Sequence, residues 1–160
     1  MLVLGFGNTL RRDDGVGVRA AELLATEPRL MRATVEVRAG FQLLPEMALD
    51  FADVTLVVLV DADLRALPGS IELRPISADA PDSDADARAE PGASSHHVGG
   101  GELVALAAEL TGRRPEAVHV GIGVADTELG EGLSPAVEAA LPRVVRVVSD
   151  LVEQHLADDD

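Results

Sequence analysis

The chain has 160 residues and no cysteine, which excludes disulfides, cysteine-ligated metal centres and a cysteine nucleophile. Its 28 acidic residues outnumber 13 basic residues and give a formal net charge of −15, so nucleic-acid binding is disfavoured because such a surface repels phosphate. All 13 basic residues are arginines, which excludes a phosphate-loop lysine and a Schiff-base lysine.

Strand and helix patterns alternate along the first half of the chain, as is typical of α/β proteins. They predict strands over Leu2–Phe6, Thr34–Val37 and Val54–Val60, and helices over Gly17–Thr26 and Phe41–Phe51. The third strand (VTLVVLV) is an almost unbroken apolar run, which indicates a strand at the centre of the sheet with both faces covered.

The second half of the chain opens with a predicted strand over Ser70–Pro75, whose apolar residues alternate as at an exposed edge. The connection from the preceding strand is too short for a parallel crossover, so we expect this strand to run antiparallel to its neighbour. Residues 77–93 are rich in Asp, Ala, Ser and Pro and are predicted to form an acidic mobile loop. A helix over Glu102–Leu110 and a parallel strand over Ala117–Val124 are expected to follow.

The last helix is the clearest element in the sequence. Ser134 is a natural N-cap and Pro135 suits the first helical position. The residues that recur at helical spacing beyond them form one apolar stripe: Val137, Leu141, Val144, Val145, Val148, Leu151 and Val152. Pro142 lies within this stripe and is expected to kink or restart the helix.

These elements predict one three-layer α/β domain over residues 1–157, followed by an acidic tail at residues 158–160. Its twisted, mostly parallel five-stranded sheet has helices on both faces and one antiparallel strand. No apolar run reaches the roughly 18–20 residues of a membrane span, and Leu2–Phe6 lacks the basic flank of a signal peptide. We therefore expect a cytoplasmic protein that does not bind membranes.

Ligands of open α/β sheets bind beyond the carboxyl ends of the parallel strands. The charged residues expected at that edge are Asp13, Asp14, Asp61, Asp63, His96, His97, Asp126, Glu128 and Glu131. Asp14 is explained equally well as a helix N-cap or a turn residue, and Ser94 and Ser95 could cap the helix that follows the two histidines. Asp61 is harder to explain structurally, since a buried carboxylate at a strand exit is costly without a partner. His119 and His155 are interpreted as structural residues.

Two carboxylates and an imidazole at one edge form an O,O,N ligand set, which suits nickel, zinc or iron with positions left open. The sequence motifs for a nucleotide-binding site or for other hydrolases are weaker or missing. Gly5-Phe6-Gly7 opens like a dinucleotide-binding fingerprint, but the third glycine position is Leu10 and the helix begins too late to meet a phosphate. Neither a GxSxG nor an HExxH motif is present.

Four segments of the chain resemble the hydrogenase maturation endopeptidases, which trim the C-terminal extension of the large-subunit precursor of nickel–iron hydrogenases. The opening GFGNTLRRDDGVG (residues 5–17) follows the family pattern G-x-G-N-x-L-x-x-D-[DE]-x-x-G. The likeness continues through VVLVDA (Val57–Ala62), SSHH (Ser94–His97) and GEGLSPAVEAALP (Gly130–Pro142). The resemblance therefore spans nearly the whole chain with similar spacing.

The resemblance implies that Asp14, Asp61 and His96 contact a metal, and that these three are also the candidates for catalytic roles. In this family the metal is thought to be nickel that arrives bound to the precursor, so no organic cofactor is implied. The implied partner is the hydrogenase large-subunit precursor, and we expect the protein to act as a monomer. His97 lies beside His96 and is the alternative ligand.

The chain departs from the family after the second strand. A family segment similar to His-Gln-Leu-Thr-Pro-Glu corresponds here to Phe41-Gln42-Leu43-Leu44-Pro45-Glu46, with Phe41 and Leu44 substituted. This departure implies a different hydrogenase substrate or less efficient processing. Two other functions remain: a non-catalytic nickel-binding or delivery protein that uses the same three residues, and a small-anion or nucleotide-binding domain that uses Gly5–Asn8 with Arg11 or Arg12.

Overall fold

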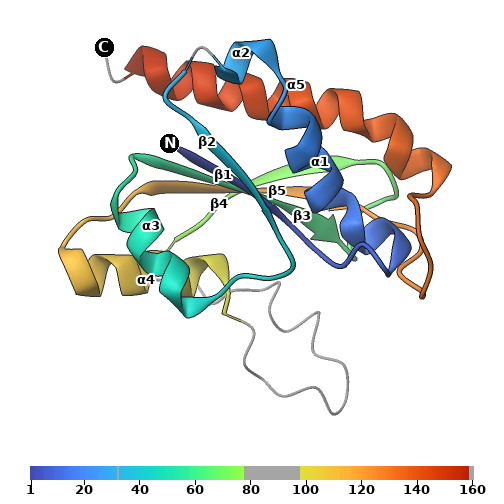
Figure 1. Ribbon diagram of the computed structural model, residues 1–160, viewed down its shortest axis with the longest axis horizontal. Coiled ribbons are helices and arrows are strands. Elements are labelled where there is room, and N and C mark those ends of the chain that lie inside the picture. The colour runs from blue at the N-terminus through green and yellow to red at the C-terminus, as the bar shows by residue number, and fades with distance from the viewer. Residues whose placement is uncertain (32, 78–97, 159–160) are drawn as a thin grey trace.

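The computed structural model describes residues 1–31, 33–77 and 98–158 (Figure 1). Its centre is a five-stranded sheet in the order β2-β1-β3-β5-β4. The strands are β1 (Leu2–Phe6), β2 (Glu36–Gly40), β3 (Leu56–Asp63), β4 (Ile71–Pro75) and β5 (Glu116–Gly123). β2, β1, β3 and β5 are parallel, and β4 pairs antiparallel with β5 at the edge.

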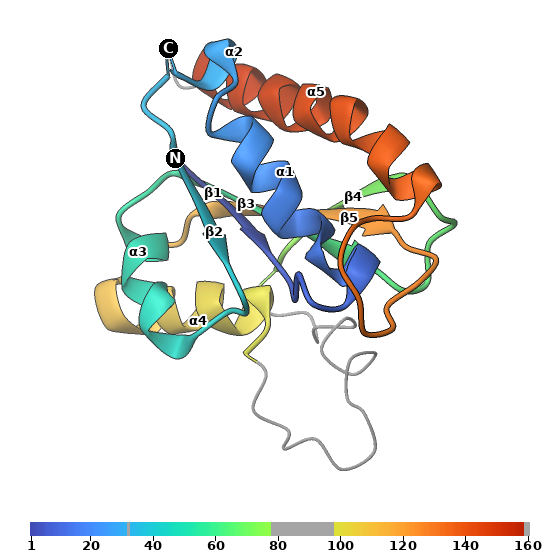
Figure 2. The ribbon, with the colours of Figure 1, turned by 45° about the vertical axis from the view of Figure 1, so that its right-hand side comes forward.

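Helices cover both faces of the sheet (Figures 1 and 2). One face carries α1 (Val16–Leu24), α2 (Pro28–Met31) and α5 (Pro135–Asp158), and the other carries α3 (Ala48–Ala52) and α4 (Gly100–Thr111). Single turns of 3-10 helix, η1 (Arg12–Gly15) and η2 (Pro45–Met47), precede α1 and α3. This arrangement confirms the predicted three-layer fold with one antiparallel strand. No helix among the described residues has the length and apolar character needed to cross a membrane.

The sheet divides the apolar core into two halves, and β3 contributes side chains to both of them. Val58 and Val60 are completely buried against α1 and α5, whereas Val57 and Leu59 are buried on the side of α3 and α4. All eight residues of β3 are buried, which confirms the central strand expected from its apolar run. The predicted α5 stripe also packs against the sheet.

Element boundaries were predicted less well in the first half of the chain. The predicted second strand at Thr34–Val37 is displaced, because pairing with β1 carries β2 from Glu36 to Gly40. The helix expected over Phe41–Phe51 is shorter: the 3-10 turn η2 starts at Pro45 and α3 follows from Ala48, since proline disfavours helical backbone in the residue before it. β3 extends to Asp63, three residues beyond its predicted end, because β5 continues to pair with it. The short helix α2 was not predicted.

β4 is an edge strand and antiparallel, as its alternation and short connection predicted. Its partner is β5, with Leu73 opposite Val120, and β3 lies on the other side of β5. The turn that leads into β4 is held against the end of β5, where the Gly69 N–H donates to the Gly123 carbonyl at 2.8 Å. The connection from β3 to β4 therefore passes the carboxyl end of β5 before the chain reverses direction into β4.

α4 confirms the helix predicted over Glu102–Leu110, but it begins at Gly100. Gly99 occupies the N-cap position, where its N–H donates to the Glu102 carboxylate at 3.2 Å. The suggestion that Ser94 and Ser95 cap this helix is wrong, because both precede the observed N-cap. Both serines and residues 78–93 of the expected acidic loop lie outside the described residues.

α5 begins at Pro135, directly after Ser134, as predicted. The Ser134 carbonyl accepts hydrogen bonds from the N–H groups of Val137 and Glu138. Of the kink and the restart expected at Pro142, the restart is wrong, since one helix runs from Pro135 to Asp158. Pro142 and Glu138 are both exposed, so the position at which Pro142 removes a helical hydrogen bond lies on the solvent side of α5.

Pro142→Ala is expected to stabilise the protein by about 1–2 kcal/mol, because alanine restores the missing N–H and has higher helix propensity. Urea unfolding of wild type and variant measures this difference. Ala139→Gly, at an exposed position in the same helix, is the control and should destabilise by about 1 kcal/mol. An unchanged or lower stability for Pro142→Ala would show that the helix is already adapted to proline.

Candidate functional site

Two loops at the carboxyl edge of the sheet are joined by backbone hydrogen bonds. Residues 8–15 follow β1 and residues 124–134 follow β5 (Figure 2). The Gly130 N–H donates to the Leu10 carbonyl at 2.9 Å, and the Arg12 N–H donates to the Gly130 carbonyl at 2.9 Å. The Asp13 N–H donates to the Asp126 carbonyl at 3.0 Å. The two loops therefore form one structured unit, which we call the paired loops.

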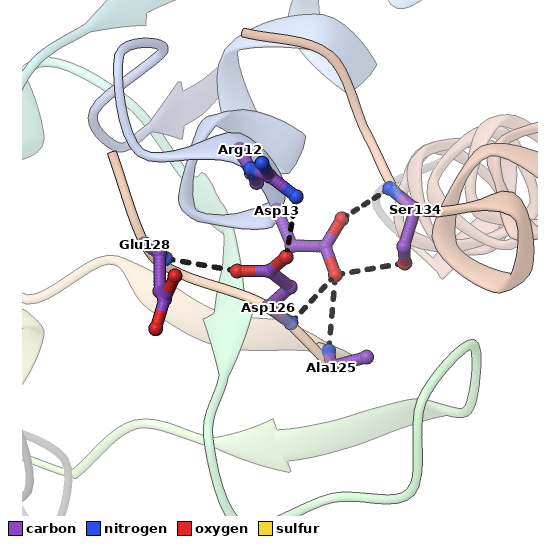
Figure 3. A network of polar contacts seen from close by, with 6 residues as sticks. All are labelled: Arg12, Asp13, Ala125, Asp126, Glu128 and Ser134. Atoms are coloured by element: carbon purple, nitrogen blue, oxygen red, sulfur yellow. Dashed lines mark hydrogen bonds and ion pairs between the residues drawn. The ribbon is translucent and has the colours of Figure 1, made fainter. Parts of the chain in front are cut away.

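Asp13 is completely buried and holds the paired loops to the start of α5 (Figure 3). Its Oδ2 accepts hydrogen bonds from the N–H groups of Ala125 (3.0 Å) and Asp126 (3.1 Å) and from the Ser134 hydroxyl (2.8 Å). Its Oδ1 accepts from the Ser134 N–H at 2.6 Å. Asp13, predicted only as one of the charged edge residues, is thus a structural anchor.

The hydrogen bonds to Asp13 also set its protonation state. Burial raises the pKa of the Asp13 carboxyl, but the hydrogen bonds from Ser134, Ala125 and Asp126 together outweigh burial and hold this pKa below its usual value. The ionised form is therefore the one that the fold stabilises. The Ser134 hydroxyl donates to this carboxylate in addition to the backbone donors.

Asp14 lies in η1 and is half-buried at the same edge. Its Oδ2 accepts a hydrogen bond from the Asn8 N–H at 2.9 Å. Gly15 occupies the N-cap position of α1, and the alternative explanation of Asp14 as that N-cap is wrong. Within the described part of the chain no hydrogen bond reaches the Asp14 Oδ1, so this carboxylate is fixed in place by one oxygen only.

Asp61 lies within β3, on the face that carries α3 and α4. It is only 3% exposed, and its Oδ1 accepts a hydrogen bond from the Ala62 N–H at 2.7 Å. Gly121 stands opposite Asp61 in β5, and a Cβ on Gly121 would lie 3.1 Å from the Asp63 Oδ2 and 3.2 Å from the His119 Cε1. A buried carboxylate at the ligand-binding edge of an α/β sheet is a candidate functional group.

Close packing brings the segments of Asp14 and Asp61 together. A Cβ on Gly17 would lie 2.3 Å from the Phe6 carbonyl oxygen and 2.4 Å from that of Val60, so the start of α1 rests directly on β1 and β3. Asp14 is one turn ahead of Gly17, and Asp61 follows Val60. The two carboxylates predicted to be metal ligands thus come from adjoining backbone segments at one edge of the sheet.

The glycines of the opening motif serve this same packing. A Cβ on Gly5 would lie 2.0 Å from the Gly17 carbonyl oxygen, and one on Gly7 (φ 144°) would lie 1.9 Å from the Asp14 carbonyl oxygen. They allow β1 to approach α1 and η1 directly. η1 also separates the glycine pair from the helix N-terminus, as expected from the sequence, so the arrangement differs from a dinucleotide-binding loop.

The histidines predicted at this edge, His96 and His97, lie outside the described residues. The chain is described again from Val98. A Cβ on Gly100 would lie 2.7 Å from the Leu59 Cδ1, so the start of α4 packs on the same face of β3 as Asp61. Among the described residues, no three His, Asp or Glu side chains are grouped closely enough to hold a metal ion.

The remaining candidates at the edge have other partners or face solvent. Asp63 is buried, forms an ion pair with Arg74 and accepts a hydrogen bond from the Arg65 N–H. Asp126 forms a 2.7 Å ion pair with Arg12. Glu128 and Glu131 are exposed.

The structural interpretation of His155 is confirmed. Its ring nitrogens lie 2.9 Å from the Thr55 Oγ1 and 3.2 Å from a Glu116 carboxylate oxygen, at the opposite edge of the sheet. His119 is buried within β5, as expected from its position in a strand.

Asn8 is a positioning residue, a role that was not predicted; the sequence suggested it only as part of the anion-binding alternative Gly5–Asn8. Its N–H donates to Asp14, and its side-chain Oδ1 accepts from the Leu10 N–H at 3.0 Å. This second bond closes an Asx turn, and the pair Gly7-Asn8 directly after the strand is the signal that could have predicted it.

Neither a protein-family model nor a curated protein matches the chain, but solved structures do. The hydrogenase maturating endopeptidase HybD from E. coli is 24% identical, with 96% of this chain and 92% of that chain covered and a TM-score of 0.71. The hydrogenase 2 maturation peptidase from a Thaumarchaeota archaeon is 28% identical, with 95% and 97% covered and a TM-score of 0.68. The [NiFe] hydrogenase maturation protease HybD from Thermococcus kodakarensis is 25% identical, with 94% and 97% covered and a TM-score of 0.66.

These structures share the α/β fold of this chain over nearly its whole length. Together with the motifs that the sequence places at the carboxyl edge of the sheet, they confirm the resemblance to the hydrogenase maturation endopeptidase family.

Proposed function

We propose that this protein is an endopeptidase that removes the C-terminal extension from the nickel-loaded large-subunit precursor of a [NiFe] hydrogenase. The peptidase class rests on the similarity to hydrogenase maturation peptidases over nearly the whole chain. The site rests on one observation: Asp14 and the buried Asp61 come from adjoining segments at the edge where α/β folds bind ligands.

In this proposal the metal belongs to the substrate, and the protein provides ligands for its open coordination positions. Asp14 and Asp61 supply carboxylate oxygens and His96 supplies an imidazole nitrogen, a set suited to nickel. His96 precedes Gly100 by four residues in the sequence, and Gly100 packs on the face of β3 that carries Asp61. This proximity supports His96 as the third ligand, with His97 as the alternative.

Shared coordination would make cleavage depend on the metal. A precursor that carries nickel is anchored by three side chains, which brings its scissile bond to the carboxyl edge of the sheet. An empty precursor lacks these bonds and is discriminated against by its lower affinity. The nickel ion also supplies a Lewis acid next to the scissile carbonyl. We further propose that the protein acts as a cytoplasmic monomer.

The direct test is incubation of the purified protein with the nickel-loaded precursor, followed by mass spectrometry of the products. The proposal predicts a precursor shortened at one site near its C-terminus. Formation of a stable complex with an intact precursor would instead support the alternative of a nickel-binding or delivery protein, and would contradict the proposed endopeptidase.

A further inference from the structure

Two leucines protrude from the paired loops into solvent. Leu10 is 60% exposed and Leu129 is 80% exposed. Leu129 directly precedes Gly130, whose N–H donates to the Leu10 carbonyl at 2.9 Å, so the two leucines are carried by neighbouring backbone positions. Phe41, which is 64% exposed, follows β2 at the same edge of the sheet. Exposed apolar side chains that gather beside a site are typical of interaction surfaces.

The backbone that carries these leucines is held by several contacts. The Arg11 Nε donates to the Thr127 carbonyl at 3.0 Å, and Arg12 forms an ion pair with Asp126. Behind them the buried Asp13 carboxylate binds both loops to the start of α5 (Figure 3). Leu10 and Leu129 are therefore displayed on an ordered scaffold, which lowers the entropy lost when a partner binds.

The charge around the leucines indicates the chemistry of the partner. Glu128 and Glu131 flank Leu129, and both are exposed. Within the described part of the chain neither glutamate forms an ion pair, whereas the two arginines of the neighbouring loop are engaged with Thr127 and Asp126. The whole chain adds a net charge of −15. A partner with basic residues is attracted to this surface, and a second copy of this acidic chain is repelled.

We infer that Leu10 and Leu129, with Glu128 and Glu131, dock a segment of the precursor in which apolar residues lie beside basic ones. This inference rests on the proposed function and adds the surface that recognises the polypeptide near the scissile bond. Asp14 is close to this surface, since its N–H donates to the Arg11 carbonyl at 3.1 Å. The metal site and the docking surface then bind adjacent parts of one substrate.

The test compares two double variants with wild type, using both the Kd for the nickel-loaded precursor and the KM and kcat for its trimming. Leu10→Ser with Leu129→Ser is expected to raise Kd and KM about tenfold or more while kcat changes less than about twofold. Glu128→Gln with Glu131→Gln is expected to raise both at low salt and to weaken the dependence of Kd on salt. The matched control is Glu109→Gln with Leu110→Ser, an exposed pair at the end of α4, which should behave as wild type.

Three outcomes separate the docking surface from the proposed activity. Unchanged Kd and KM in both double variants would overturn the docking surface while trimming by wild type still supports the endopeptidase. A wild type that binds the precursor but does not trim it would overturn the endopeptidase, and the Kd values of the variants would still decide the docking surface. No binding of the precursor by wild type would overturn both. Thermal unfolding of each variant checks that the exposed substitutions leave the fold intact.

Discussion

Replacing Asp14 with asparagine is expected to reduce trimming of the nickel-loaded precursor at least about 100-fold, the scale of losing one transition-state-stabilising group. Asparagine retains an oxygen that can accept the 2.9 Å hydrogen bond from the Asn8 N–H, so η1 should keep its conformation. What the variant loses is the negative charge and a strong metal ligand. Trimming rates measured by mass spectrometry, with circular dichroism to monitor the fold, test this expectation.

The matched control for this prediction is Asp53→Asn. Asp53 is an exposed aspartate that follows α3, at the opposite edge of the sheet from Asp14. The Asp53→Asn variant should trim the precursor at the wild-type rate. Equal rates for Asp14→Asn and wild type would remove Asp14 from the site, whereas a variant of Asp14 that is inactive because it has unfolded would be identified by its circular dichroism spectrum.

Asp13→Ala is expected to destabilise the protein by about 4 kcal/mol, because it leaves the donors of Ala125, Asp126 and Ser134 unsatisfied in a buried space. For a chain of this length such a change lowers Tm by roughly 10 °C. Differential scanning calorimetry measures it. Arg12→Ala, which removes the partly exposed ion pair with Asp126, is the control and should cost no more than about 1 kcal/mol.

The stability difference between wild type and Asp13→Ala should depend on pH. Because the pKa of Asp13 is lowered in the folded state, its stabilising effect is fully present above the unfolded-state pKa near 3.8 and is lost as the pH falls through the folded-state pKa. The difference in unfolding free energy between wild type and Asp13→Ala should therefore be constant at neutral pH and shrink below about pH 4. A difference that grows on acidification would contradict the role of the Asp13 carboxylate as a hydrogen-bond acceptor.

The sequence predicted the parts of the fold that depend on local patterns. The apolar run of β3 and the stripe of α5 report burial directly, so a central strand and a long helix could be recognised. The pairing of β4 with β5 could not be recognised, because it depends on contacts between segments far apart in the chain. Of the kink and the restart expected at Pro142, the restart was wrong for a similar reason, since packing of the apolar stripe maintains the helix past the proline.

In the candidate site, too, local patterns could be predicted from the sequence and long-range contacts could not. Motif and topology placed Asp14 and Asp61 at one edge of the sheet, which the structure confirms for both residues. The sequence could not distinguish the roles of Asp13 and Asp14, because two adjacent aspartates have the same chemistry and differ only in which loop donors they meet. Asp13 turns toward Ser134 and is buried, whereas Asp14 meets Asn8 and keeps one oxygen available for a ligand.

Asp14, Asp61 and His96 are proposed to recognise a metal that the substrate brings. The most direct measurement is the rate of C-terminal trimming for one precursor preparation divided into nickel-loaded and nickel-free halves. We expect wild type to shorten the loaded half alone, and Asp61→Asn to lose that shortening. Equal trimming of both halves by wild type would contradict recognition of the substrate's metal.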